Sequence, residues 1–319
     1  MVGRRRSPPP GPRVKGHKPG LYLLLAAALP LAGLYACGGP GAALPTALPL
    51  PAPTPTPSPS PVAVVISVDG LRPDVFRMAD FPSINALSRR GAYTWKAQTV
   101  FPPTTLPSHA SMLSGMPPSA HRLTWNDFQP ERGFIAVPTV FSIAKAAGLR
   151  TVMVVGKEKL RHLAAAGTVD SFVLTGRGDQ DVANEALVQV QAGFDLMFVH
   201  FPETDITGHQ HGWLSPSYVA SVADLDRALG RLLSALPPHA TVILSADHGG
   251  RGVAHGYNIP EDMTIPWIVA GPRVVAGREL ARSVSTMDTA ATALHVLGLA
   301  LPPGASGSVV TEALASPAP

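Results

Sequence analysis

Aspartates and histidines gather in short segments of this chain, in a pattern typical of a metal site. Asp205 and His209 lie four residues apart, so one turn of backbone can direct both side chains at the same point. Asp247 and His248 are adjacent, and His255 follows seven residues later. A lone histidine is more often an ordinary surface or core residue. Carboxylate and imidazole together are the ligand set of Zn²⁺, with Mn²⁺ or Fe²⁺ as alternatives, so the joint pattern indicates a metal.

The acids of this pattern follow apolar runs that resemble buried strands. Asp69 follows one run, Asp205 lies just beyond a second, and Asp247 ends a third. These runs cover residues 62–68, 196–201 and 241–245. Such β-branched or apolar runs without alternation are typical of parallel strands buried on both faces. Ligands of parallel sheets bind at the carboxyl ends of the strands, so we expect the three acids to meet there.

The elements that must position these residues alternate along the chain. Two further strand-like runs cover residues 151–155 and 265–270. Helical patterns cover residues 83–90, 138–147, 158–166, 183–191, 218–236 and 288–297. Strands that alternate with helices predict an α/β fold, a doubly wound and mainly parallel sheet with helices on both faces.

A possible nucleophile precedes another helix. Residues 99–115 pass from a Pro-rich loop into a helix that we expect to start near Pro107, because proline is tolerated in a first helical turn. Thr105 would then lie at a helix N-terminus, where free N–H groups and the helix dipole favour an anion. A hydroxyl beside a metal ion can act as a nucleophile. The alternative is that Thr104 and Thr105 only cap the helix.

These motifs together resemble the alkaline phosphatase superfamily, and within it the type I phosphodiesterase/nucleotide pyrophosphatase group. The resemblance extends over residues 64–270, with the motifs in the family's order. The matching segments are Val68 to Asp74, Thr105 to His109, Asp205 to His209, Asp247 to Gly249, and His255-Gly256. The family fold is the doubly wound α/β sheet that the runs already predict.

The resemblance implies roles for individual residues. It makes Thr105 the nucleophile, and it makes Asn126 the donor to a phosphate oxygen. It implies two divalent metal ions, of which Zn²⁺ is favoured over Mn²⁺. The first ion would be held by Asp69, Asp247, His248 and Thr105, and the second by Asp205, His209 and His255. The implied activity is hydrolysis of a small phosphate-ester or phosphodiester substrate, as in a nucleotide pyrophosphatase.

Two features depart from the larger family members. A long insertion between the Asp-His pair and the last histidine helps to build their substrate pocket, whereas six residues separate His248 from His255 here. No pair of aromatic residues is placed to enclose a nucleobase. Trp125, Trp213 and Tyr257 lie near the motifs, where they either line the pocket or serve ordinary packing.

Other functions and other histidines stay open at this point. A phosphomonoesterase on the same site is the nearest alternative, and a non-catalytic surface lipoprotein that retains the fold is another. His211 could serve as a reserve ligand or as a partner of a ligand. We take the remaining histidines near the motifs as ordinary residues. They are His109, His121, His162 and His200.

Composition argues against a nucleic-acid scaffold. The chain has 319 residues and a net charge of +4, with 14% charged and 45% hydrophobic residues, which is typical of a folded protein. Six of the cations precede the first apolar run, and without them 19 basic residues face 21 acidic ones. The positive charge therefore belongs to a tail, and the body lacks a basic stripe that could follow a phosphate backbone.

The N-terminal region predicts an address outside the cytoplasm. Residues 1–37 combine a basic segment, a short apolar stretch and Cys37 in a form similar to a bacterial signal peptide with a lipobox. Residues 38–61 form a Pro-rich linker, and residues 62–313 are expected to form the hydrolase domain. We expect a lipid anchor at Cys37 and a membrane-anchored or secreted protein. An uncleaved anchor helix and plain secretion remain alternatives.

Overall fold

The computed structural model of the chain describes residues 60–176 and 178–315. The predicted signal peptide, the lipobox at Cys37 and nearly all of the Pro-rich linker lie outside these residues. Within the described ranges, no helix is both long enough and apolar enough to cross a membrane.

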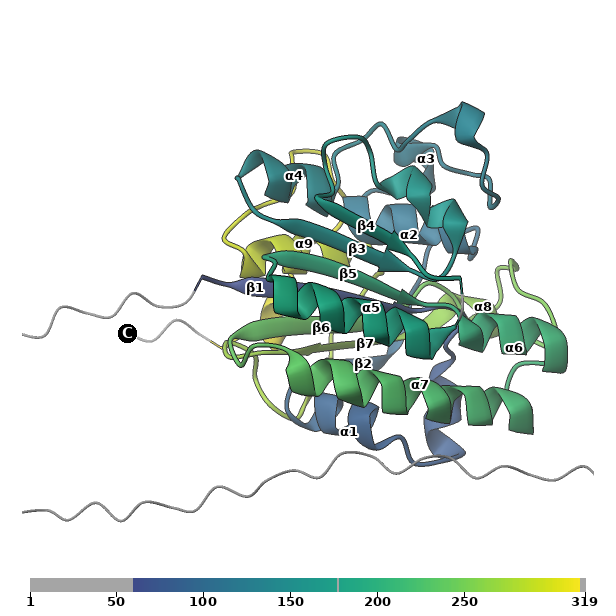
Figure 1. Ribbon diagram of the computed structural model, residues 1–319. Coiled ribbons are helices and arrows are strands. Elements are labelled where there is room, and N and C mark those ends of the chain that lie inside the picture. The colour runs from purple at the N-terminus through teal and green to yellow at the C-terminus, as the bar shows by residue number, and fades with distance from the viewer. Residues whose placement is uncertain (1–59, 177, 316–319) are drawn as a thin grey trace, which may run out of the picture. The chain divides into compact units, whose positions relative to one another are not determined.

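One sheet of eight strands forms the centre of the described unit (Figure 1). Its order is β4-β3-β5-β1-β6-β7-β2-β8. The strands are β1 (Val62–Val68), β2 (Ala92–Gln98), β3 (Thr151–Val155), β4 (Ser171–Leu174), β5 (Leu196–Phe201), β6 (Ala240–Ala246), β7 (Thr264–Ala270) and β8 (Arg278–Glu279). Only β7 runs against its neighbours among these strands, because it pairs antiparallel with both β6 and β2. The prediction of a mainly parallel sheet is confirmed.

Helices cover both faces of the sheet (Figure 1). One face carries α1 (Pro82–Arg89), α5 (Asp179–Ala192) and α7 (Pro216–Ala235), which pack beside one another. The other carries α2 (Thr105–Ser114), α4 (Val140–Ala146) and α9 (Asp288–Val296). Three further helices, α3 (Pro118–His121), α6 (Glu203–His211) and α8 (Pro260–Met263), lie in the connections. The 3₁₀ helices are η1 (Pro73–Arg77), η2 (Pro130–Arg132), η3 (Glu158–Leu163) and η4 (Thr311–Ala313).

Several predicted boundaries change. The segment predicted as a helix over residues 158–166 is the 3₁₀ helix η3. The helix expected near Pro107 begins two residues earlier, so Thr105 is its first residue. Asp205 lies in the first turn of α6 rather than at the end of β5. The sequence patterns did not predict β2, β4 or β8, which are short or partly exposed and carry no continuous apolar run.

The register of the central strands sets the position of the site. Every residue of β1, β3, β5 and β6 is buried, as expected for strands covered on both faces. Val68, the last residue of β1, pairs with Phe201 of β5 and with Ala246 of β6. The three strands therefore end at the same level. Asp69 and Asp247, the next residues of β1 and β6, emerge side by side.

Candidate metal centre

The two aspartates at the strand ends are each held by protein donors through one oxygen only. Asp247 Oδ1 accepts hydrogen bonds from the N–H of Gly70 at 3.0 Å and from the next residue's N–H at 2.9 Å. Asp69 Oδ2 accepts from His200 Nε2 at 2.9 Å and lies 2.8 Å from Lys157 Nζ. We call these satisfied atoms the outer oxygens. They fix the direction of each carboxylate.

The third aspartate repeats this arrangement from a different element. Asp205 lies on α6, and its outer oxygen Oδ2 is 2.5 Å from Lys157 Nζ. The remaining oxygens, Asp69 Oδ1, Asp205 Oδ1 and Asp247 Oδ2, are buried without a hydrogen-bond partner in the described part of the chain. We call these three atoms the inner oxygens. Because an unpartnered buried carboxylate oxygen is costly, the inner oxygens indicate that a cation belongs beside them.

Three histidines face the inner oxygens, and the backbone fixes which nitrogen each presents. In each ring, Nδ1 lies within hydrogen-bond distance of a carbonyl oxygen. The pairs are His209 with Val253 at 2.9 Å, His248 with Gly249 at 2.7 Å, and His255 with Pro103 at 2.9 Å. A carbonyl only accepts, so Nδ1 carries the proton in all three rings and the neutral ring presents a lone pair at Nε2.

The lone pairs of these histidines point at the carboxylates. His248 Nε2 lies 3.4 Å from both Asp69 Oδ1 and Asp247 Oδ2. The Nε2 atoms of His209 and His255 lie 3.4 and 3.5 Å from Asp205 Oδ1. A lone pair and a carboxylate oxygen repel at such distances unless a proton or a metal ion lies between them. Against the effect of burial, the charges of Asp247 and Asp69 raise the pKa of His248 to about 9. The donor set of oxygen and imidazole nitrogen fits Zn²⁺, and Nδ1 bonded to a carbonyl is the usual support of a metal-bound histidine.

Ligand atoms form two groups that could each hold an ion. Asp69, Asp247 and His248 make one group, and they are the acids and the histidine of the first set implied by the resemblance, which also includes Thr105. The second group contains Asp205, His255 and again His248, with all ligand atoms of a group within 4.8 Å of one another. His209 is the predicted member outside the second group, although it contacts Asp205 from the rim with a side chain 44% exposed. His248 therefore lies between the two positions, and its ring stacks on His255 at 3.7 Å between centroids.

Burial and neighbouring charges shift the pKa values of Asp69 and Asp247, the two carboxylates at the strand ends, in opposite directions. Burial raises the pKa of both. The negative charge of Asp69 raises the pKa of Asp247 further. For Asp69 the cation of Lys157 and the hydrogen bond from His200 outweigh burial, so its pKa lies well below its ordinary value. The centre thus keeps one carboxylate firmly ionised through its own residues.

Thr105 begins helix α2 and is 1% exposed. Its carbonyl accepts a hydrogen bond from His109 Nδ1 at 2.7 Å, and the same nitrogen lies 3.5 Å from Asp247 Oδ2. Asn126 Oδ1 accepts from the N–H of Leu106 at 2.9 Å, so the asparagine lies against this helix start. The structure thus brings the two residues assigned to the phosphate pocket together at the N-terminus of α2, beside the aspartates.

A polar layer beneath the centre was missed by the sequence reasoning. Ser67 of β1 pairs in register with His200 of β5 and with Ser245 of β6. His109 Nε2 lies 2.8 Å from the Ser67 hydroxyl, and His200 Nε2 donates to Asp69. His109 and His200, taken as ordinary residues, therefore support the centre from below. A polar residue next to the last position of otherwise apolar strands was the available signal.

Lys157 was missed as well. It follows β3, the strand beside β5, and Gly156 separates it from the strand end. A lysine at a strand end carries no sequence signal for a metal site, because a cation is not a metal ligand. Four adjacent strands, β3, β5, β1 and β6, thus lead to charged side chains that meet in one place.

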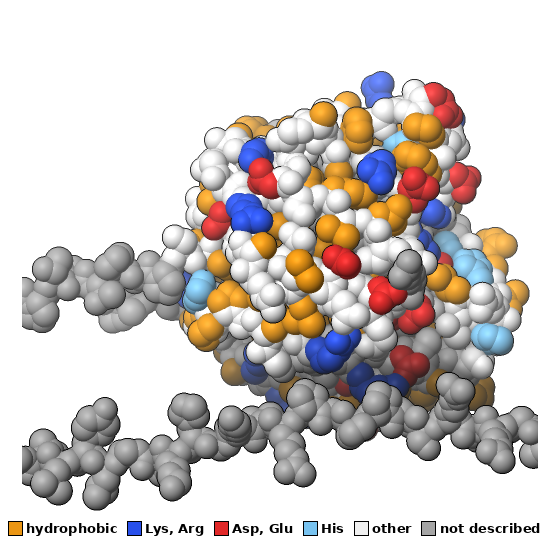
Figure 2. All heavy atoms as spheres, viewed as in Figure 1, with side chains coloured by type: hydrophobic (Ala, Val, Ile, Leu, Met, Phe, Trp, Pro, Cys, Tyr) orange, Lys and Arg blue, Asp and Glu red, His pale blue; other side chains and the backbone are white. Residues whose placement is uncertain are grey.

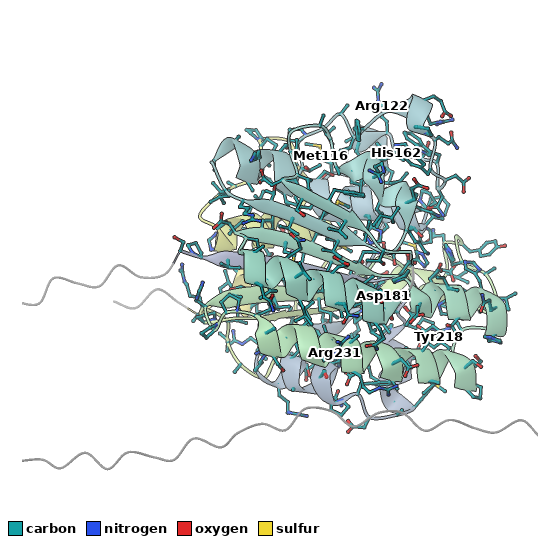
Figure 3. All side chains as sticks on the ribbon, viewed as in Figure 1. Met116, Arg122, His162, Asp181, Tyr218 and Arg231 are labelled. Atoms are coloured by element: carbon teal, nitrogen blue, oxygen red, sulfur yellow. The ribbon has the colours of Figure 1, made fainter. Side chains whose placement is uncertain are left out.

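Trp213 serves packing rather than the substrate pocket. Its side chain is buried, and Nε1 donates to the carbonyl of Gly70 at 2.8 Å. A Cβ at Gly250 would come within 2.3 Å of its ring, so the close approach of the ring requires glycine there. Tyr218, labelled on α7 in Figure 3, donates to the same Gly70 carbonyl at 2.8 Å. Both side chains support the loop behind Asp69.

The other histidines serve the surrounding loops. His121 Nε2 lies 3.0 Å from the hydroxyl of Ser111, and burial lowers its pKa to about 4. His162, labelled in Figure 3, accepts from the N–H of Gln129 at 3.0 Å and packs edge-on against Trp125. These contacts hold the segment that carries Asn126. His211 is exposed and joins neither ligand group, so the structure gives no support for it as a reserve ligand.

The centre reaches the surface at His209 of α6, whose side chain is 44% exposed. Figure 2 shows histidine side chains at that edge of the molecule, with hydrophobic side chains next to them. Phe101, Val253 and Tyr257 are exposed by 59%, 57% and 61% and lie within four residues of Thr105 or His255. Of the three aromatics considered from sequence, Tyr257 alone is exposed at this rim.

Comparisons with known proteins agree with this fold. Residues 63–266 match the model of the type I phosphodiesterase / nucleotide pyrophosphatase family. A phosphopentomutase of Methylobacterium radiotolerans is 30% identical over 198 residues, which cover 58% of this chain and 44% of that protein. An uncharacterized pyrophosphatase/phosphodiesterase of Schizosaccharomyces pombe is 26% identical over 213 residues, with the same coverage. The chain thus spans less than half the length of these curated relatives.

Solved structures share the fold at low sequence identity. Murine ectonucleotide pyrophosphatase / phosphodiesterase 5, an inactive variant in complex with AMP, superposes with a TM-score of 0.69 at 15% identity. The match covers 80% of this chain and 100% of the murine one. A 2-O GAG sulfatase superposes with a TM-score of 0.67 at 16% identity, over 79% of this chain and 74% of that one. At such identities the likeness concerns the fold.

Proposed function

The chain belongs to the type I phosphodiesterase / nucleotide pyrophosphatase family, and on that premise we propose that it is a metal-dependent hydrolase of phosphoric esters, most readily of diesters. One observation carries the proposal. Three unpartnered carboxylate oxygens and three imidazole lone pairs converge where neighbouring strands end. Such a donor set has no evident purpose without cations, and a pair of cations is suited to phosphoryl chemistry.

The residues divide between two divalent ions, with Zn²⁺ favoured and Mn²⁺ as the alternative. Asp69, Asp247, His248 and the hydroxyl of Thr105 would hold one ion. Asp205, His209 and His255 would hold the other, with His248 close to both positions. When bound, the ions supply charge that polarises the phosphoryl oxygens and lowers the pKa of a coordinated hydroxyl.

Thr105 is the proposed nucleophile. Its hydroxyl loses a proton, and its oxygen attacks phosphorus in line with the leaving oxygen. A bond from Thr105 Oγ1 to phosphorus forms as the bond to the leaving oxygen breaks, and the proton lost by Thr105 ends on the leaving alcohol. Water then cleaves the phosphothreonine, which restores the Thr105 hydroxyl and releases the phosphoryl product. The free N–H at the start of α2 and the Asn126 amide can donate to the phosphoryl oxygens, whose charge grows during the reaction.

A second candidate activity, phosphomonoester hydrolysis, is favoured by Lys157. Its ammonium lies at one aspartate of each ligand group, Asp69 and Asp205, so it adds a permanent positive charge to the centre. A monoester presents a dianionic phosphoryl group, which gains more from that extra charge than a monoanionic diester does. The AMP bound by the murine structure is itself a monoester, which supports a small phosphate-ester ligand for this fold.

We also propose that the enzyme works outside the cytoplasm, tethered through a lipid at Cys37. Support comes from the sequence alone, from the apolar stretch that ends at Cys37 and the Pro-rich linker that leads to β1. Labelling cells with a radioactive fatty acid tests this, with Cys37→Ala as the control that should remove the label. Labelling of both proteins, or of neither, would contradict the tether.

Rates with two chromogenic substrates test the activity. Zinc-loaded protein is mixed with bis(p-nitrophenyl) phosphate and, separately, with p-nitrophenyl phosphate, and kcat/KM is measured for each. We expect turnover of both, with the diester faster, and loss of both rates in Thr105→Ala. A faster monoester would establish the second candidate. No turnover of either substrate, with zinc bound, would favour a binding protein that retains the fold.

A further inference from the structure

Lys157 is a buried cation that the proposed chemistry does not require. Its side chain is 15% exposed, and its Nζ lies 2.8 Å from Asp69 Oδ2 and 2.5 Å from Asp205 Oδ2. These two acids come from different elements, the end of β1 and helix α6, and they belong to different ligand groups. A single ammonium thus joins the two halves of the centre.

The ammonium of Lys157 and the expected metals use different oxygens. Lys157 contacts only the outer oxygens of Asp69 and Asp205, while the inner oxygens of both face the histidines. The lysine is therefore compatible with bound metal and need not leave when metal enters.

The backbone fixes the position of this lysine. Gly156 packs so tightly against Pro202 that an added Cβ would lie 2.3 Å from the proline ring. The N–H of Gly156 also donates to His200 Nδ1 at 3.4 Å. Pro202 immediately precedes α6, the helix that carries Asp205. The end of β3 is thus held against the start of α6, which places Lys157 at the two acids.

The negative charge of the three aspartates explains what the contacts of Lys157 contribute. Three nearly buried carboxylates, Asp69, Asp205 and Asp247, would repel one another strongly without a cation. We propose that Lys157 is a positioning residue that stands in for metal charge, so that the two ligand groups keep their metal-ready arrangement while no metal is bound. This inference rests on the metal-binding part of the proposed function.

Thermodynamic linkage predicts the direction in which removing Lys157 changes zinc affinity. A contact that stabilises the metal-free centre more than the zinc-loaded centre must weaken metal binding. The loss in binding free energy equals the difference between the two stabilisation energies. Removing Lys157 should therefore destabilise the metal-free protein and tighten zinc binding. An ordinary structural contact would stabilise both states equally and would leave zinc affinity unchanged.

The test compares Lys157→Met, Lys157→Arg and the unchanged protein, each stripped with a chelator and each saturated with zinc. Lys145→Met is the matched control, because it also removes a lysine–aspartate ion pair, with Asp170, but on the surface far from the ligands. Thermal melting gives the Tm of each state. Competition with a chromogenic chelator gives the zinc Kd and needs only zinc-loaded protein.

We expect Lys157→Met to lower the Tm of the metal-free protein by several degrees more than it lowers the Tm of the zinc-loaded protein. Its zinc Kd should fall by at least about tenfold. Lys157→Arg, which keeps the charge, should remain close to the unchanged protein in both measurements. Lys145→Met should shift both Tm values equally. A Lys157→Met chain that folds only with zinc would be the extreme form of the expected result.

Equal Tm losses with and without zinc, or weaker zinc binding, would overturn the inference. A Lys157→Met chain that fails to fold even with zinc would overturn it too, since metal would then not replace the lysine. Zinc binding and turnover by the unchanged protein, together with such a result, would leave the proposed function intact. A chain that binds no zinc at all would contradict the proposed function itself.

Discussion

Two layers of histidines lie at the same sheet edge, and they differ in what their second nitrogen faces. In the upper layer, His248 and His255 hold Nδ1 on a carbonyl and direct Nε2 at bare carboxylate oxygens. In the lower layer, His109 pairs Nε2 with the hydroxyl of Ser67, and His200 donates from Nε2 to an outer oxygen. Both nitrogens of a lower histidine thus have matched partners, whereas Nε2 of each upper histidine faces a carboxylate oxygen that only a proton or a metal ion can bridge.

This difference separates ligands from supports. Polar groups whose hydrogen bonds are all made hold the surrounding residues in place. Buried polar groups without a partner indicate where a further charge binds. Burial alone does not make the distinction, because His248 and His200 are both 0% exposed. Substitutions in the two layers should therefore have different consequences for metal content and turnover.

The largest effect is expected from the upper layer, in His248→Ala. His248 contacts acids of both ligand groups, so its loss should release metal and reduce kcat/KM on the order of 10⁴-fold or more. Metal analysis and diester kinetics on the same preparation check this. Retention of all zinc would show that His248 is not a ligand and would erase the difference between the layers.

Thr105→Ala should abolish turnover without emptying the centre. The hydroxyl is the proposed nucleophile, so its loss should lower kcat by at least about 10³-fold, while most ligands for both ions remain. The same paired measurement, zinc content and kcat, separates this result from that of His248→Ala. Near-normal turnover in Thr105→Ala would remove the nucleophile from the account.

His200→Phe tests the lower layer. The substitution keeps an aromatic ring of similar size but removes the donor to Asp69, so we expect a 10–100-fold loss in metal affinity or activity. Chelator competition gives the affinity, and His121→Phe, a buried histidine away from the acids, serves as the comparison. If His200→Phe behaved like His248→Ala, the two layers would not differ as argued.

Asp179 provides the smallest expected effect on turnover. It is a buried acid near α6 that accepts from the N–H of Glu203 at 3.1 Å, while Oδ2 has no partner among the described residues. Burial, with the charge of Glu203, raises its pKa to about 8 from an ordinary 3.8. Between these values the folded chain holds a proton that the unfolded chain releases. Stability from this group is full below about pH 4 and is lost as the pH rises to about 8.

Asp179→Asn should flatten that dependence. The amide keeps an acceptor for Glu203 but cannot ionise, so the variant should gain up to a few kcal/mol relative to the unchanged protein between pH 5 and pH 8. Urea denaturation at the two pH values measures the gain. If the free energy of unfolding fell equally with pH in both proteins, Asp179 would be ionised throughout, as Asp69 is beside Lys157.

Much of the centre followed from sequence because ligands sit where buried strands end. Continuous runs such as 62–68 predicted β1 and its neighbours, and the common register placed Asp69 beside Asp247. The partly exposed β2 and the two-residue β8 carry no such run, so packing alone determines them.

The remaining residues depend on contacts that sequence distance hides. Lys157 meets Asp205 across 48 residues, and His200 meets Asp69 across 131. Lys157 and His200 reach these acids only because folding aligns the ends of their strands. Lysine and histidine are common residues in proteins, so their presence in the sequence does not indicate such a role. Trp213 was ambiguous for the same reason, since only the close packing of Gly250 shows that it is a support.

Metal content tests the central claim most directly. Purified protein is loaded with zinc, dialysed against metal-free buffer and measured by elemental mass spectrometry against protein concentration. The account predicts two equivalents of zinc per chain, because the inner oxygens are divided between two ligand groups. Zinc retained at one equivalent or none would contradict the two-metal centre.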